Sequence, residues 1–297
     1  MISIIIPSKN RPELVCRAIS SVKNQSFKDY EIVLINDGSD VSYDHVKNSL
    51  DSSDVYIENQ ESLGVSAARN AGILQAKYDW ILFLDDDDEL RSGYLDVLAC
   101  CILNNPGKDF FWSDVVIYIS EGSNLIRKLV REWPRSYWNQ DHLYSTALSI
   151  GASFGLAIKK EVLISIGLFD PKLAIGEDMD LVIRLLEHDA KPKSIPFCGI
   201  NKFEVSKERL SAGFMRYSVD QIFERIFQKN NLFFSRHPYC KAVLIYFAAS
   251  VHAANKDLIS ENSLLDNLFD LGFYKLYFEY KIKRFLKGSG FLVRALT

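Results

Sequence analysis

Four consecutive carboxylates, Asp85 to Asp88, are the side chains most able to do chemistry in this chain. They directly follow the apolar run Trp80–Leu84, which is typical of a strand buried on both faces of a sheet. Adjacent negative charges repel one another unless a cation neutralises them. Hard oxygen ligands at the carboxyl end of a strand suit Mg²⁺ or Mn²⁺. A solvated acidic turn is the alternative, and the strand before the run favours the cation site.

Four other residues could bind a ligand or transfer a proton. Asp37 ends an apolar segment and could accept a hydrogen bond from a nucleobase or ribose, or could be an ordinary Asp-Gly turn residue. Arg69 lies early in a helical segment and could bind a diphosphate, or could be an exposed helix arginine. Glu177 and Asp178 open another helical segment. One of them could act as a general base, although the helix dipole alone favours acids there.

The composition is that of an ordinary globular protein. The 297 residues carry a formal net charge of −3, which gives no case for a nucleic-acid partner. The five cysteines show no metal-ligand spacing, so we expect a reducing compartment, the cytoplasm. We find no signal peptide, and the longest later apolar stretch, residues 242–251, is too short to span a bilayer comfortably.

The elements that must position these residues alternate along the chain. Strand-forming and helical segments alternate over the first 90 residues, which is typical of a parallel α/β sheet. The carboxyl ends of such strands share one edge, so Asp37 and the aspartate run should face the same crevice. Strands are expected at residues 2–6, 30–35, 55–58, 80–84, 109–118 and 193–201, and helices at 65–76, 177–187, 216–230, 238–254, 260–271 and 274–286.

Five segments together resemble glycosyltransferase family 2, a group of nucleotide-sugar-dependent enzymes with the GT-A fold. They are SIIIPSKNR (3–11), VLINDGSD (33–40), GVSAARNAG (64–72), FLDDDDEL (83–90) and GLFDPKLAIGEDMDLVIRL (167–185). The resemblance implies an α/β GT-A domain with a Rossmann-like mixed sheet over residues 1–206. The remaining residues, 207–297, would form a helical C-terminal region.

The resemblance also implies a role for each matched residue. Pro7, Lys9, Asp37, Arg69, Asp85 and Asp86 would bind the donor, and Asp87 would ligate Mn²⁺ or Mg²⁺. The four adjacent aspartates leave the D-x-D register ambiguous by one position. Asp178 would be the catalytic base, and Glu177 would lie close to the acceptor.

The function that this resemblance implies is inverting transfer of one sugar from a UDP-sugar to a saccharide hydroxyl. Assembly of bacterial surface polysaccharide, such as lipopolysaccharide O-antigen, is the implied setting, with an undecaprenyl-diphosphate-linked saccharide as a candidate acceptor. The alternatives are a nucleotidyltransferase that makes sugar nucleotides and an inactive homologue that binds them. A nucleotidyltransferase would need a glycine-rich signature after the first strand, and PSKNRPE does not supply one.

The C-terminal segment, residues 274–297, mixes basic and aromatic side chains against the single acid Glu279. Such a segment could lie on an anionic membrane surface, which would place the enzyme peripherally on the inner face of the cell membrane. It could equally be a helix packed on protein with a solvated basic face.

Overall fold

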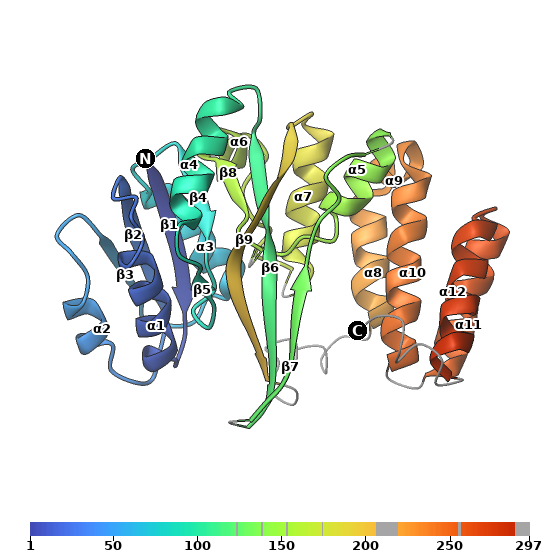
Figure 1. The fold of residues 1–297 in the computed structure, drawn as a ribbon, viewed down its shortest axis with the longest axis horizontal. Helices are drawn as coiled ribbons and strands as arrows, with labels where there is room; N and C mark the ends of the chain where they lie inside the picture. Colours follow the sequence, from blue (N-terminus) through green and yellow to red (C-terminus); the bar gives the residue numbers. More distant parts are fainter. Residues whose placement is uncertain are drawn as a thin grey trace. The chain divides into compact units, whose positions relative to one another are not determined.

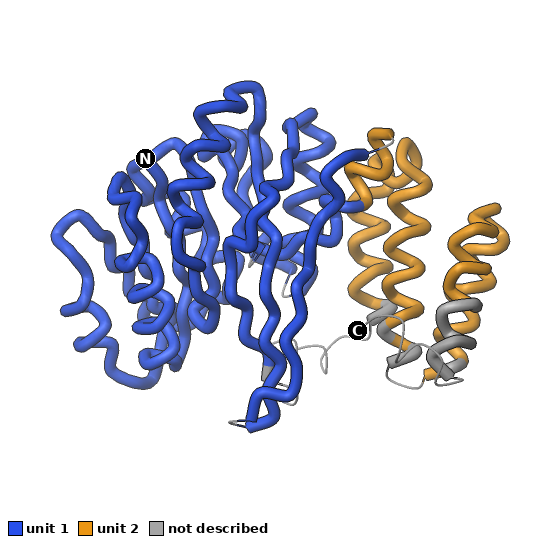
Figure 2. The backbone as a smooth tube through the Cα atoms, in the orientation of Figure 1, with its two compact units in different colours: residues 1–137, 146–213 blue, residues 138–145, 214–297 orange. Residues whose placement is uncertain are grey.

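The computed structural model describes residues 1–122, 124–137, 139–152, 154–173, 175–205, 219–254 and 257–288. The chain divides into two compact units, residues 1–137 with 146–213, and residues 138–145 with 214–297 (Figure 2). The domain boundary expected after residue 206 falls in the stretch 206–218, which lies outside the described residues.

All the described strands of the first unit form one nine-stranded sheet in the order β3-β2-β1-β4-β8-β6-β9-β5, with β7 paired to β6 (Figure 1). The strands are β1 (Ile2–Ser8), β2 (Tyr30–Asp37), β3 (Val55–Asn59), β4 (Trp80–Phe83), β5 (Glu89–Leu90), β6 (Phe110–Glu121), β7 (Asn124–Arg131), β8 (Ala157–Lys159) and β9 (Pro192–Val205). The first four strands are parallel, as alternation predicts, whereas β8 runs antiparallel to both β4 and β6. The sheet is therefore mixed, as the family resemblance implies.

Helices flank this sheet and follow it in the chain. They are α1 (Pro12–Lys23), α2 (Asp44–Asn48), α3 (Val65–Gln75), α4 (Tyr94–Asn104), α5 (Gln140–Ala147), α6 (Lys160–Ser165), α7 (Glu177–Glu187), α8 (Val219–Lys229), α9 (Asn231–Arg236), α10 (Pro238–Ala254), α11 (Leu258–Asp270) and α12 (Tyr274–Gly288). The helix expected at 216–230 covers α8, and a separate short helix, α9, follows it.

Strand β1 is apolar at nearly every position because both of its faces are covered. Ile4 and Ile6 belong to the core cluster that also contains the buried side of α1. Ile5 points to the opposite face, where α3 approaches closely at Gly72. A Cβ atom on Gly72 would lie only 2.8 Å from Cγ2 of Ile5. Alternation along the strand therefore explains an unbroken apolar run.

Pro7 does not end the first strand, so the prediction of a strand over residues 2–6 was too short. Strand β1 continues through Pro7, which pairs with Ile35, to Ser8. The pairing of β1 with β4 stops at Ile5, so beyond that residue β1 has a strand neighbour on one side only. Proline is tolerated at such an edge because no ladder hydrogen bond needs its missing N–H group. The extension carries Ser8 to the end of the sheet where the aspartates lie.

The second unit has its own apolar cluster, formed by Ala242, Ile245, Ala249, Leu265, Leu268 and Tyr280. These residues come from α10, α11 and α12, so the three helices pack on one another. Across the described ranges, no helix combines the length and the apolar character needed to cross a bilayer.

Candidate active site

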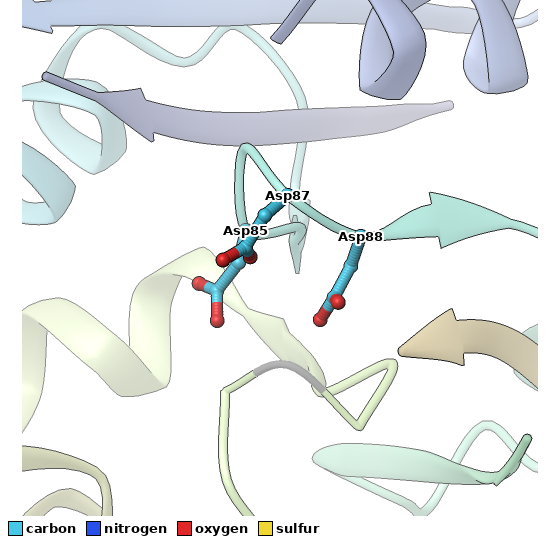
Figure 3. A group of neighbouring side chains, drawn as sticks. All are labelled: Asp85, Asp87 and Asp88. Atoms are coloured by element: carbon cyan, nitrogen blue, oxygen red, sulfur yellow. The ribbon is translucent and has the colours of Figure 1, made fainter. Parts of the chain in front are cut away.

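The acidic run folds into a turn directly after β4. The backbone N–H of Asp88 donates to the carbonyl of Asp85 over 3.2 Å, which closes the turn. One carboxylate oxygen from each of Asp85, Asp87 and Asp88 lies within 4.8 Å of the other two (Figure 3). Three hard oxygen donors at this spacing fit a divalent cation of the Mg²⁺ or Mn²⁺ type.

Asp86 does not belong to this group of three. Its Oδ2 accepts a hydrogen bond from Ser8 Oγ at 2.7 Å, and its Oδ1 lies 3.2 Å from Nη1 of Arg11. The same Arg11 nitrogen lies 3.0 Å from Oδ2 of Asp87, so one guanidinium holds two adjacent acids. The turn therefore brings Asp85, Asp87 and Asp88 together. The expected role of Asp86 in donor binding stays a prediction.

Asp88 is the member of the cluster to which the sequence assigned no role. It is fully buried, and it accepts hydrogen bonds from the backbone N–H of Phe203 at 3.0 Å and from Lys202 Nζ at 3.3 Å. Both partners lie on β9, which reaches Asp88 because β5 pairs with β9. No local sequence pattern predicts this contact, because it depends on strand pairing between segments more than a hundred residues apart.

Burial and neighbouring charges shift the pKa values of the aspartates in different directions. Burial alone would raise the pKa of Asp85, but the charges of Arg69 and Lys202 outweigh it and lower that pKa. Burial raises the pKa of Asp86 to about 6. Burial and the neighbouring charge of Asp85 raise the pKa of Asp87. Acids this close together are an environment that a divalent cation would stabilise.

Arg69 joins the aspartate turn to the start of α7. It is almost fully buried on α3, with Nη2 2.9 Å from Oδ1 of Asp85. Its Nη1 lies 2.9 Å from Oε1 of Glu177 and 3.3 Å from Oδ1 of Asp178. The expected proximity of Arg69 to a diphosphate is untested, but both of its terminal nitrogens already bind carboxylates. The guanidinium is the shared cationic partner of three crowded acids.

Helix α7 presents Glu177 and Asp178 at its first turn. Gly176 precedes the helix with φ of 78°, a left-handed conformation that glycine adopts readily. Asp178 is held on its second oxygen as well, because Oδ2 accepts from the backbone N–H of Ala152 at 2.9 Å. Burial, followed by the charge of Asp178, raises the pKa of Glu177 to about 8. The pKa of Glu177 is therefore raised although its side chain contacts Arg69.

Asp37 is buried at the end of β2, and its carboxylate is saturated by protein donors. Its oxygens accept from Asn59 Nδ2 at 2.8 Å, from Ser62 Oγ at 2.8 Å, and from the backbone N–H groups of Leu63 at 3.0 Å and Gly64 at 2.9 Å. These four hydrogen bonds hold the loop that leads into α3. Binding of a nucleobase by Asp37, the role the resemblance implies, would require one of these donors to be displaced.

The two remaining expected donor residues lie at the end of β1. Pro7 is buried in the strand, whereas Lys9 is exposed just beyond it. Ser8, between them, has a more central position because its hydroxyl bonds both Asp86 and the Tyr43 hydroxyl, the latter at 2.7 Å. A serine in the stretch Ser8-Lys9-Asn10 has no distinctive sequence pattern around it, so no site role was predicted for Ser8.

Comparison with known proteins identifies the class to which this fold and site belong. Residues 3–167 match the family model described as glycosyl transferase family 2, and the chain therefore belongs to that family. The mixed sheet followed by helices is the GT-A architecture. S. aureus TarS 1-349, solved in complex with UDP-GlcNAc, matches it with a TM-score of 0.65 over 91% of this chain and 80% of that one, at 16% identity.

Two curated relatives are similar over part of the chain. An uncharacterized glycosyltransferase of Haemophilus influenzae is 29% identical over 198 residues, 66% of this chain and 65% of that protein. The GalNAc(5)-diNAcBac-PP-undecaprenol beta-1,3-glucosyltransferase of Campylobacter jejuni is 41% identical over 101 residues, 33% of each chain. The matches thus span less than two thirds of these relatives' own lengths. Membership of the family favours sugar transfer over the nucleotidyltransferase alternative.

Proposed function

We propose that this protein is an inverting, metal-dependent glycosyltransferase that moves one sugar from a UDP-sugar to a hydroxyl of a saccharide acceptor. The observation that most supports the proposal is that Arg69 binds both Asp85 and Asp178. These contacts bring a potential general base on α7 to an acid cluster suited to a cation that binds a diphosphate. A donor and an acceptor could therefore meet at one place.

The residues of the chain have distinct tasks in this reaction. Asp85, Asp87 and Asp88 would hold Mn²⁺ or Mg²⁺, which when bound stabilises the negative charge that develops on the departing nucleoside diphosphate. Asp178, oriented by Ala152 and Arg69, takes the proton from the acceptor hydroxyl. Attack from the side opposite the leaving group inverts the anomeric carbon, so a UDP-α-sugar gives a β-linkage.

The biological setting is part of the same proposal. The Campylobacter relative is named for action on an undecaprenol-diphosphate-linked saccharide, which supports a lipid-linked acceptor in surface polysaccharide assembly. A cytoplasmic enzyme in contact with the inner membrane surface suits that acceptor. Of the C-terminal basic residues expected to make such a contact, Lys275, Lys281, Lys283, Arg284 and Lys287 lie on α12, and Arg294 lies outside the described residues.

Calorimetric titration of UDP with and without Mn²⁺ tests the metal-dependent step. The wild-type protein should bind UDP in Mn²⁺ and at least about tenfold more weakly in EDTA, a difference of about 1.4 kcal/mol. Asp87→Asn should lose this gain from Mn²⁺. Asp96→Asn is the control, because it removes an exposed aspartate charge on α4 that does not belong to the cluster. Equal UDP affinity in Mn²⁺ and EDTA would count against the metal site.

Sugar transfer itself needs a second measurement. A panel of UDP- and GDP-sugars should show release of the nucleoside diphosphate in the presence of a saccharide acceptor, and the proton NMR coupling of the product should report the inverted anomer. Binding of UDP without release from any donor would favour the inactive-homologue alternative. A product that keeps the donor's anomeric configuration would exclude inversion.

A further inference from the structure

Arg131, the last residue of β7, is a half-buried cation with an unusual environment. Its guanidinium carbon lies 4.3 Å from the centre of the Trp133 ring and 5.4 Å from that of Phe154. Among the described residues, its side chain makes no hydrogen bond and no ion pair with a carboxylate. Burial lowers the pKa of Arg131, and no neighbouring acid opposes this effect. A partly desolvated charge without a partner is costly, and an anionic ligand would relieve the cost.

The aromatic support under Arg131 is fixed by its own contacts. Trp133 is buried; its Nε1 donates to the carbonyl of Ser113 at 2.8 Å, and its backbone N–H donates to Asp114 at 2.9 Å. The Trp133 and Phe154 rings meet edge to face with their centres 5.9 Å apart. A rigid support of this kind orients the guanidinium before any ligand arrives, which reduces the entropic cost of binding.

Phe154 connects this support to the candidate active site. A Cβ atom placed on Gly151 would lie 3.2 Å from Oδ2 of Asp178 and 3.6 Å from Cε2 of Phe154, so the carboxylate and the ring flank the same glycine. Lys202, which pairs with Asp88, lies 5.9 Å from the centre of the Phe154 ring. The ring therefore stands beside the proposed base and near the proposed metal cluster.

We propose that Arg131, supported by Trp133 and Phe154, binds an anionic group of the acceptor. This inference rests on the proposed sugar transfer, in which the acceptor must approach Asp178. The planar guanidinium can make paired hydrogen bonds to a phosphate or a carboxylate. The anion could be the diphosphate of a lipid-linked saccharide or the carboxylate of an acidic sugar, and both present the same paired oxygens.

Direct binding of soluble probes tests the assignment. Geranyl diphosphate, methyl glucuronide and the neutral alcohol geraniol are titrated by calorimetry into the full chain, both in EDTA and with UDP plus Mn²⁺. The variant is Arg131→Gln. Arg127→Gln is the matched control, because Arg127 lies four residues earlier on β7, on the same face, and is exposed; within the described residues it has no ring beneath it.

The wild-type protein and Arg127→Gln should bind one of the two anionic probes with the same affinity. Arg131→Gln should bind that probe at least about tenfold more weakly, because a charge-assisted pair of hydrogen bonds is lost. Preference for geranyl diphosphate indicates the lipid diphosphate, and preference for methyl glucuronide indicates an acidic sugar. Geraniol should bind to none of the proteins.

Three results would overturn the assignment: no anionic probe bound by the wild type, equal affinity in Arg131→Gln, or equal losses in both variants. If Arg131→Gln does not fold, Arg131→Lys replaces it. Lysine keeps the charge but loses the planar fork, so unchanged affinity there would also overturn the assignment. Because the EDTA titration does not require UDP, a failure of metal-dependent UDP binding would weaken the proposed function without deciding the role of Arg131.

Discussion

Replacement of Asp178 by asparagine tests whether this side chain is the general base of the proposed reaction. The amide has the size of the carboxylate, and its oxygen can still accept the Ala152 N–H bond of 2.9 Å. Arg69 keeps its ion pairs with Asp85 and Glu177. The fold and the donor site should therefore persist. The lost property is proton acceptance, because an amide is not a base at neutral pH.

The expected magnitude follows from that loss. A positioned general base contributes roughly 10²- to 10⁴-fold to a rate. A central value of about 10³-fold corresponds to about 4 kcal/mol of transition-state stabilisation. Glu177 should compensate little, because burial and the Asp178 charge raise its pKa to about 8 and keep it mostly protonated at pH 7. Removing that charge eases ionisation of Glu177, so a small residual activity is expected, and the double variant with Glu177→Gln should abolish it.

The assay compares kcat at saturating donor with UDP affinity in Mn²⁺. Asp178→Asn should lose about 10³-fold in kcat with UDP affinity within a factor of about three. Glu177→Gln is the matched control: it replaces a mostly neutral acid that contacts the same Arg69 nitrogen, and its kcat should fall less than about tenfold. A kcat for Asp178→Asn within tenfold of the wild-type value, or equal losses in both variants, would refute the base assignment.

Two further perturbations probe the framework of the site. Arg69→Met leaves three acids without their shared buried partner, so we expect it to cost about 3–5 kcal/mol of unfolding free energy in denaturant titrations; a change below about 1 kcal/mol would contradict the role of Arg69 as their common counterion. Asp37→Asn should destabilise the protein at neutral pH. The four hydrogen bonds outweigh burial and lower the pKa of Asp37 in the folded state, so its charged form stabilises the fold above the ordinary value of 3.8. That advantage is lost as the pH falls through the lowered value, and a deficit in Asp37→Asn that stays constant from pH 7 to acid would argue against it.

The parts of the fold that are local in sequence could be predicted. Apolar runs and helical spacing indicated the parallel half of the sheet, and the aspartate run after Leu84 indicated a strand end with a cation site. The expected fold class and family are confirmed. The end of β1 was mispredicted at Pro7. Proline fits in β1 because β4 no longer pairs with β1 at that residue, and this cannot be read from the local sequence.

The parts of the site that depend on distant pairing could not be predicted. Lys202 meets Asp88 only because β5 pairs with β9. Arg131 acquires its aromatic support from Trp133 and Phe154, which lie on either side of α5 in the sequence. The ion pairs of Arg69 with Glu177 and Asp178 cross more than a hundred residues of sequence. The family resemblance implied site roles for Arg69, Glu177 and Asp178, but not that these three residues bind one another.

The shared guanidinium of Arg69 has an evolutionary consequence. Because one side chain binds Asp85 after β4 and both Glu177 and Asp178 on α7, a substitution at any of these residues changes how the others are held, and the energetic effects will not add. We expect strong epistasis among these four positions, so lineages of this enzyme should change them together or leave them alone. Diversification of sugar preference would then accumulate in the periphery, where single replacements act independently.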